Sequence, residues 1–287
     1  MDLEENANMD HQTQTLHELR ALIEEQQELL RLVLYVMSQG PIDYKGERLT
    51  SVLEWDKARA TVAVSMGAGQ SLNTILKLSG EPGIGVRDLY PIARSVVEGF
   101  INAAFFVTQP VEVAQRALRH IQFAAWKHHN RVIGSGEFMM TVSGDPDPKG
   151  TLEKQFSEFA GRGQGSWTNL DAPARISRVG DVVRAAGGAL LGAYAAIYSV
   201  SSEIIHGSVY GMSYFFSAHL REQSKEAFLA ATNEHIIDIY SAVSHAASGF
   251  LAAFANIHKF GPLVLDEHEL FKRLYRSATG VDWNGGD

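Results

Sequence analysis

The sequence predicts an all-α protein built as a helical bundle. Apolar residues recur in steps of three and four along most of the chain, and sustained alternation with a period of two is nearly absent. No repeat of solenoid length is evident, and glycine and proline pairs separate the helical stretches. With 287 residues, 45% of them hydrophobic, the chain is long enough to bury a sizeable core.

The first helix is predicted to follow a disordered start and to end at Gly40-Pro41. Two interpretations of its apolar stripe are open: a helix through which the chain forms a homo-oligomer, or an amphipathic helix folded back on its own domain. We expect residues 1–40 to be separate from a bundle domain over residues 41–279, with a flexible tail at 280–287. The stripe has heptad spacing and consists of Leu16, Leu19, Ile23, Gln26, Leu30, Val33 and Met37.

Helix-start and helix-stop signals predict the later elements in order. Glycine, aspartate and proline crowd residues 134–150, which predicts a loop or lid, and glycines mark a second loop at 161–167. The last helix is expected to begin at Asp266, which has capping-box spacing to Glu269. Helices are expected at residues 49–78, 88–108, 110–131, 151–160, 173–186, 189–206, 225–259 and 266–277.

Composition excludes several kinds of site. The chain has no cysteine, so disulfides, thiolate zinc sites and thiol catalysis are excluded. A formal net charge of −8 disfavours an extended nucleic-acid-coating surface. The acidic start does not resemble a secretory signal, and the most apolar stretches, 187–200 and 236–257, are too short or are interrupted by charged or polar residues. These features predict a cytoplasmic protein without membrane contact.

Two apolar stretches carry polar side chains at helical spacing. Tyr198, Ser202 and His206 are four residues apart, as are Arg94 and Glu98 in the other stretch. Isolated charges are costly in a core, so we expect Arg94, Glu98 and His206 to converge on one site.

The residue types in this set suggest acid–base and anion chemistry. His206 can act as a general acid or base, and Tyr198 and Ser202 can orient it or bind a substrate. The planar fork of Arg94 suits phosphate or carboxylate, and Glu98 one turn later can hold that fork in place. The alternative is a buried Arg–Glu–His network that only pins helices together, which is the commoner use of such groups.

A basic stripe on the helix at residues 110–131 is a second candidate. Arg116, His120, Lys127 and Arg131 lie close to one face, in a geometry that suits a phosphate-tracking patch, although a solvated basic face is the commoner explanation. No metal site is predicted, because the adjacent His128 and His129 point about 100° apart on a helix. No cofactor is predicted either, since the glycines at 161–165 follow no strand and lack the phosphate-loop ending.

Several of these residues together resemble a known family. Arg94-Ser-Val-Val-Glu98, Trp167, Tyr194 and the segment Tyr198–Ser208, with its Ser-x-x-x-His-Gly-Ser pattern, resemble an uncharacterised bacterial family of unknown function over residues 49–260. That family in turn is similar to the HEPN group, many of whose members are metal-independent ribonucleases of toxin and anti-phage systems. HEPN enzymes use an Arg and a following His on one helix at a dimer interface.

The resemblance implies a metal-independent endoribonuclease or phosphodiesterase. Its HEPN-type motif has four to six residues between the Arg and the His, whereas three separate Arg116 from His120, so Arg94 and His206 would have to pair across helices. In this hypothesis Arg94, Glu98 and His206 are catalytic, RNA or another phosphate-bearing molecule is the partner, and the remaining residues bind or orient it. The second hypothesis is a non-catalytic helical sensor or scaffold that binds a small anionic ligand or a protein partner. The binding or orienting residues are Tyr198, Ser202, Arg116, His120, Lys127 and Trp167.

Overall fold

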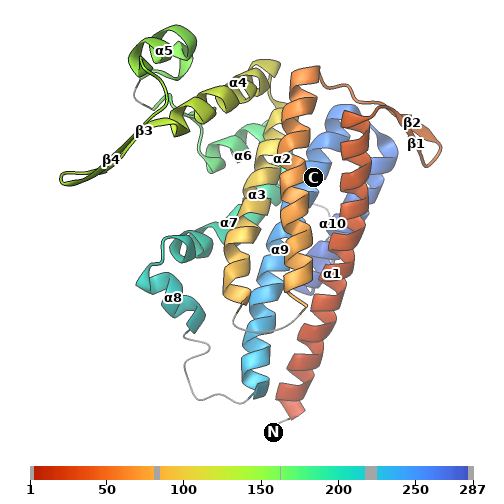
Figure 1. Ribbon diagram of the computed structural model, residues 1–287. Helices are drawn as coiled ribbons and strands as arrows, with labels where there is room; N and C mark the ends of the chain where they lie inside the picture. The colour runs from red at the N-terminus through yellow and green to blue at the C-terminus, as the bar shows by residue number, and fades with distance from the viewer. Residues whose placement is uncertain (1–2, 81–84, 162, 217–224, 284–287) are drawn as a thin grey trace.

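The computed structural model describes residues 3–80, 85–161, 163–216 and 225–283 of the chain. Within them the protein is a helical bundle with two short antiparallel hairpins, so the predicted all-α fold is confirmed (Figure 1). The helices are α1 Leu3–Ser38, α2 Trp55–Leu78, α3 Val86–Thr108, α4 Val111–His128, α5 Pro148–Gln155, α6 Ala172–Gly180, α7 Arg184–Ile205, α8 Val209–Phe216, α9 Lys225–His258 and α10 Gly261–Thr279. The strands are β1 Ile42–Tyr44, β2 Glu47–Leu49, β3 Asn130–Ser135 and β4 Phe138–Ser143, and a 3-10 turn covers Ser157–Phe159.

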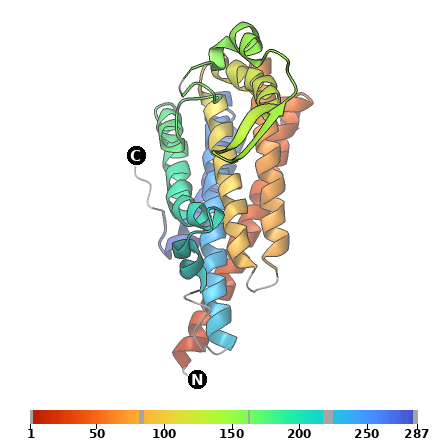
Figure 2. The ribbon, with the colours of Figure 1, turned by 60° about the vertical axis from the view of Figure 1, so that its left-hand side comes forward.

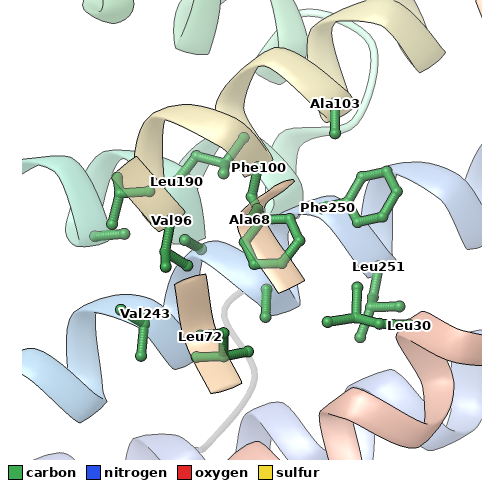
Figure 3. Packing of buried hydrophobic residues seen from close by; sticks show 14 of the residues in the cluster. Leu30, Ala68, Leu72, Val96, Phe100, Ala103, Leu190, Val243, Phe250 and Leu251 are labelled. Carbon is green, nitrogen blue, oxygen red and sulfur yellow. The ribbon is translucent and has the colours of Figure 1, made fainter. Parts of the chain in front are cut away.

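Helix α9 is the centre of the bundle. It contacts α1, α3, α7 and α10, and α2 packs against both α1 and α3 (Figures 1 and 2). The middle of the core is a stack of two fully buried rings, Phe100 of α3 and Phe250 of α9, whose centroids are 5.7 Å apart. Leucines from three other helices surround them (Figure 3). Burial of so many large apolar groups is the main term that stabilises this arrangement.

Helix α1 shares this core and is not a separate unit. Its stripe is buried: Leu19, Ile23 and Val33 have no exposed surface, and α1 contacts α2, α9 and α10. Of the two interpretations of the stripe, the helix folded back on its own domain is the one that the structure has. The expectation of an independent oligomerisation helix over residues 1–40 is therefore corrected, because the apolar surface on which it depended is covered within the chain. Self-association as such stays a prediction.

Residues 130–143 form the hairpin β3–β4 where a loop was expected from Gly134 onward. Ser135 pairs with Phe138 across a two-residue turn, in which Gly136 has a φ of +61°. Such a positive φ is typical of the turns that close hairpins. The hairpin extends away from the bundle beyond α4 (Figure 1), and Phe138 at its tip is 88% exposed.

The last helix also differs from its expected start. Helix α10 begins at Gly261 with Pro262 in its first turn. Proline is favourable there because the N–H group that it lacks would have no partner within the helix. Asp266 therefore lies inside the helix rather than at its cap. Its carboxylate accepts a 2.7 Å hydrogen bond from the Tyr44 hydroxyl and thereby ties the β1–β2 hairpin to α10.

Candidate functional site

Polar side chains of α3, α6 and α7 meet on one side of the bundle. Arg94, Glu98 and Asn102 succeed one another at four-residue spacing on α3, so they form one stripe. Helix α7 contributes aromatic rings to this stripe, and α6 contributes an arginine. We call the group the arginine–tyrosine cluster; it comprises Arg94, Glu98, Asn102, Trp167, Arg175, Tyr194 and Tyr198.

Arg94 is held on two sides. Its Nε donates a 2.8 Å hydrogen bond to Oε1 of Glu98, and its guanidinium carbon lies 4.2 Å from the centroid of the Tyr198 ring. Within the described part of the chain, neither Nη atom has a hydrogen-bond partner. The Arg94 side chain is 21% exposed and that of Glu98 36%. The outer edge of a fixed guanidinium therefore carries unused donors.

Two stacked tyrosines form the platform under Arg94. The rings of Tyr194 and Tyr198 are 4.4 Å apart between centroids and are inclined by 26°. Burial raises the pKa of Tyr194 to about 12, and its interactions with Tyr198 and the charge of Asp171 add to the rise, while Arg94 opposes it. Tyr194 therefore stays a neutral phenol throughout the physiological range, and its side chain is hydrogen-bonded to that of Tyr198.

Arg175 of α6 connects its own helix to α3 and to Trp167. Its Nη1 donates to Oδ1 of Asn102, its Nε donates to the Asp171 carbonyl at 3.3 Å, and its guanidinium carbon is 5.4 Å from the Trp167 ring centroid. Burial lowers the pKa of Arg175, whereas the negative charges of Glu98 and Asp171 raise it. An arginine remains charged under these conditions. Since its contacts are to protein groups, Arg175 anchors α6 to α3.

His206 is not brought to the Arg94–Glu98 pair. It caps the end of α7, where its backbone N–H donates to the Ser202 carbonyl at 3.0 Å, and its side chain is exposed. Among the described residues, its imidazole has no hydrogen bond or ion pair. His206 comes eight positions after Tyr198, which corresponds to roughly 12 Å along the helix axis. Ser202 is half-buried and contributes its carbonyl to this cap.

The basic residues of α4 mostly hold the neighbouring segment. Arg116 donates to the carbonyls of Glu158, Gln164 and Ser166 at 3.2, 3.1 and 3.2 Å. His120 Nε2 lies 3.3 Å from the Gly165 carbonyl. These contacts fix the chain that leads into Trp167, so Arg116 and His120 act on the cluster indirectly. Lys127 is exposed beside the Phe123 ring, with its Nζ 5.9 Å from the centroid.

Trp167 connects this segment to the core. Its ring centroid lies 5.0 Å from that of Phe106 and 6.2 Å from that of Phe105. Its position next to Arg175 makes it part of the cluster. No group of three or more His, Asp or Glu side chains with metal-binding geometry occurs among the described residues.

Sequence comparison places the cluster within a family. Residues 79–225 match DUF5677, a family of unknown function. The chain belongs to this family. The predicted membership of an uncharacterised domain family is thus confirmed, and the match includes no link to the HEPN group. The DUF5677 segment runs from the end of α2 to the start of α9 and carries every residue of the cluster, whereas α1 and α10 lie outside it. No curated protein and no solved structure matches the chain.

In the part of the chain that the structure describes, two helices are long and apolar enough to cross a membrane. The apolar window of α9 is 78% buried inside the bundle, as is typical of the core helix of a soluble protein, and that of α7 is 33% buried. Length and composition of this kind are weak grounds for a membrane span. The cytoplasmic location stays a prediction.

Proposed function

We propose that this DUF5677 protein is a non-catalytic helical binding protein whose arginine–tyrosine cluster holds the anionic group of a ligand or partner. The observation that carries the proposal is the state of Arg94. Its guanidinium is fixed by Glu98 and Tyr198, yet both Nη atoms lack partners in the described chain. A planar fork with a free edge matches two oxygens of a carboxylate or phosphate.

Preorganisation favours this use of Arg94. Ordering a long side chain on binding costs free energy, and here the ion pair with Glu98 and the stack on Tyr198 have already ordered it. Glu98 bonds only to Nε of Arg94, so a ligand can reach the edge formed by the two Nη atoms without displacing Glu98.

Acid–base catalysis finds less support in the same geometry. A general acid or base must titrate near the working pH and lie within hydrogen-bond reach of the reacting group. Glu98 is engaged with Arg94, and the pKa of Tyr194 is about 12. His206 lies two turns beyond Tyr198 on α7. These facts favour binding over catalysis at the cluster.

A titration of the purified full-length chain tests the proposal. The probes are inorganic phosphate, citrate and a ribonucleoside monophosphate, and the readout is the NMR signals of the Tyr194 and Tyr198 rings. We expect saturable shifts of these signals and a roughly tenfold weaker affinity in Arg94→Gln, because a charged hydrogen-bond donor is lost. Arg31→Gln is the matched control, since Arg31 also pairs with a glutamate on its own helix but lies exposed on α1. Equal binding by Arg94→Gln, or no saturable shift with any probe, would contradict the proposal.

Ribonuclease activity is the second candidate, and one observation favours it. The His206 imidazole is exposed and has no bonded partner in the described chain, so it is available to a substrate or to a second copy. The kinship with HEPN nucleases remains a prediction. Incubation of single-stranded RNA with the wild type in a chelator, beside His206→Ala, distinguishes the two candidates. Cleavage that disappears in His206→Ala would support the nuclease, and intact RNA in both samples would support the binding protein.

A further inference from the structure

We infer that a cavity between α1, the end of α2 and α9 is a second ligand site, which takes a small organic molecule with one carboxylate or phosphate group. It lies on the α1 side of the bundle, whereas the arginine–tyrosine cluster involves α7 on the other side (Figure 1). Its volume of about 390 Å³ falls in the size range of small-molecule sites. The polar residues that line it are Thr13, His17, Arg20, Ser79, Asn233 and Tyr240.

The charge of the lining indicates an anion. Arg20 is a cation, and none of the described residues that line the cavity is acidic. The carboxylate that pairs with Arg20, that of Glu24, is not among the lining residues. Leu16 and Ile236 form the apolar part of the wall, which suits a short hydrocarbon portion attached to the anionic group.

A chain of hydrogen bonds fixes Arg20 in the wall. The Ser79 hydroxyl donates to the Ile75 carbonyl at 2.6 Å and is 2.5 Å from the Tyr240 hydroxyl. Because the Ser79 proton is used, Tyr240 must be the donor to Ser79. Tyr240 in turn accepts from Nη1 of Arg20 at 3.5 Å, and the same nitrogen donates to the Leu76 carbonyl at 3.0 Å. The direction of every bond in the chain is therefore determined.

The remaining nitrogen of this guanidinium is the one that can serve a ligand. Nε of Arg20 donates to Glu24 at 3.2 Å, and Nη2 has no partner in the part of the chain that the structure describes. The protein thus holds Arg20 through two nitrogens and leaves the third to the cavity. The Asn233 amide and the His17 ring, which line the same space, can add hydrogen bonds to the second and third oxygens of the anion.

Titration with three matched probes tests the site in the full-length protein. Butyrate and butyl phosphate carry the two anionic groups, and butanol is the uncharged control. We expect saturable NMR shifts of the His17 ring and the Asn233 side-chain amide with one or both anions, none with butanol, and weaker binding at higher salt. Arg20→Gln should reduce the affinity roughly tenfold or more, because the charged donor is removed.

Two further variants keep the test decisive. Arg94→Gln should bind these probes in the cavity between α1 and α9 like the wild type. The test of this cavity therefore does not depend on whether the arginine–tyrosine cluster binds anions. Asn233→Leu leaves the Arg20–Tyr240–Ser79 bonds in place but replaces an amide donor of the cavity wall with a larger apolar group, so it should weaken the shift of the His17 ring even if Arg20→Gln proves too unstable to study. Binding of butanol as strong as that of the anions, unchanged binding in Asn233→Leu, or no saturable shift would overturn the inference.

Discussion

Gln26 of α1 and Arg94 of α3 are both polar residues on otherwise apolar helices, and the protein treats them in opposite ways. The Gln26 amide donates to the Ser244 carbonyl at 3.0 Å and to the Ser248 hydroxyl at 3.2 Å, and its oxygen accepts from the Ser244 hydroxyl at 2.8 Å. It is 1% exposed. Arg94 uses one nitrogen and keeps an accessible edge.

The difference separates a structural polar group from a binding one. Buried polar groups are normally satisfied, because an unpaired one loses its hydrogen bonds to water without replacement. Gln26 obeys this rule and joins α1 to α9. Arg94 is fixed in position while part of its hydrogen-bonding capacity is unused, which is how a preorganised binding group differs from a structural one.

The largest expected effect is on the free energy of unfolding, when Gln26, the buried residue of the two, is replaced. Gln26→Ala leaves a cavity and removes the partner of the Ser244 hydroxyl, so the free energy of unfolding should fall by about 2–4 kcal/mol. Urea denaturation followed by circular dichroism measures it. Gln14→Ala is the control, because Gln14 is exposed and, among the described residues, bonds only to Glu18 on the same helix. A loss in Gln26→Ala no greater than in the control would mean that the buried network contributes little.

Glu267 lies next to the Gln26 network, and the pH dependence of stability that it causes allows a second test of the comparison. Burial raises the pKa of Glu267 on α10 to about 7, and a hydrogen bond with Ser248 only partly opposes the rise. Ser248 thus connects this carboxyl to Gln26. Glu98, in contrast, has Arg94 beside it.

The sign of the effect follows from the raised pKa of Glu267. Between its usual value of about 4.3 and about 7, the unfolded chain has lost the proton that the folded chain retains, so stability falls as the pH rises through this window. Glu267→Gln should remove this contribution. Its stability relative to the wild type should therefore increase between pH 4.5 and pH 7.5 in urea denaturation. A constant difference between the two proteins would show that Glu267 does not titrate in this range.

The sequence predicted the helices well because their buried faces impose a period of 3.6 residues. It could not decide where α1 packs, since the same apolar stripe suits a partner in another chain or in the same one. The β3–β4 hairpin was missed for a related reason. Alternation appears in a strand only when one face is buried, and most of this hairpin is exposed on both faces.

The site was predictable to the extent that it is local. Pairing of Arg94 with Glu98 follows from four-residue spacing on one helix. Asn102 extends the same stripe and could have been found from the same rule. Arg175 could not, because its contact with Asn102 depends on how α6 packs against α3. Tyr198 and His206 were grouped by spacing, but His206 is the C-cap of α7, roughly 12 Å along the axis beyond Tyr198, and the spacing alone does not show that its imidazole lies outside the cluster.

The smallest expected effect concerns His206. Its imidazole is exposed at the end of α7 and makes no bond to the cluster in the described chain. His206→Ala should therefore change neither the melting temperature, by more than about 1 °C, nor the affinity for phosphate at Arg94, by more than about twofold. Calorimetric melting and the tyrosine-ring titration measure the two quantities. Arg94→Gln tested in parallel shows that the titration can detect a loss. A marked loss of phosphate affinity in His206→Ala would mean that His206 reaches Arg94 after all, by a rearrangement of α7 or from a second copy, and the open edge of Arg94 would then be half of a composite site.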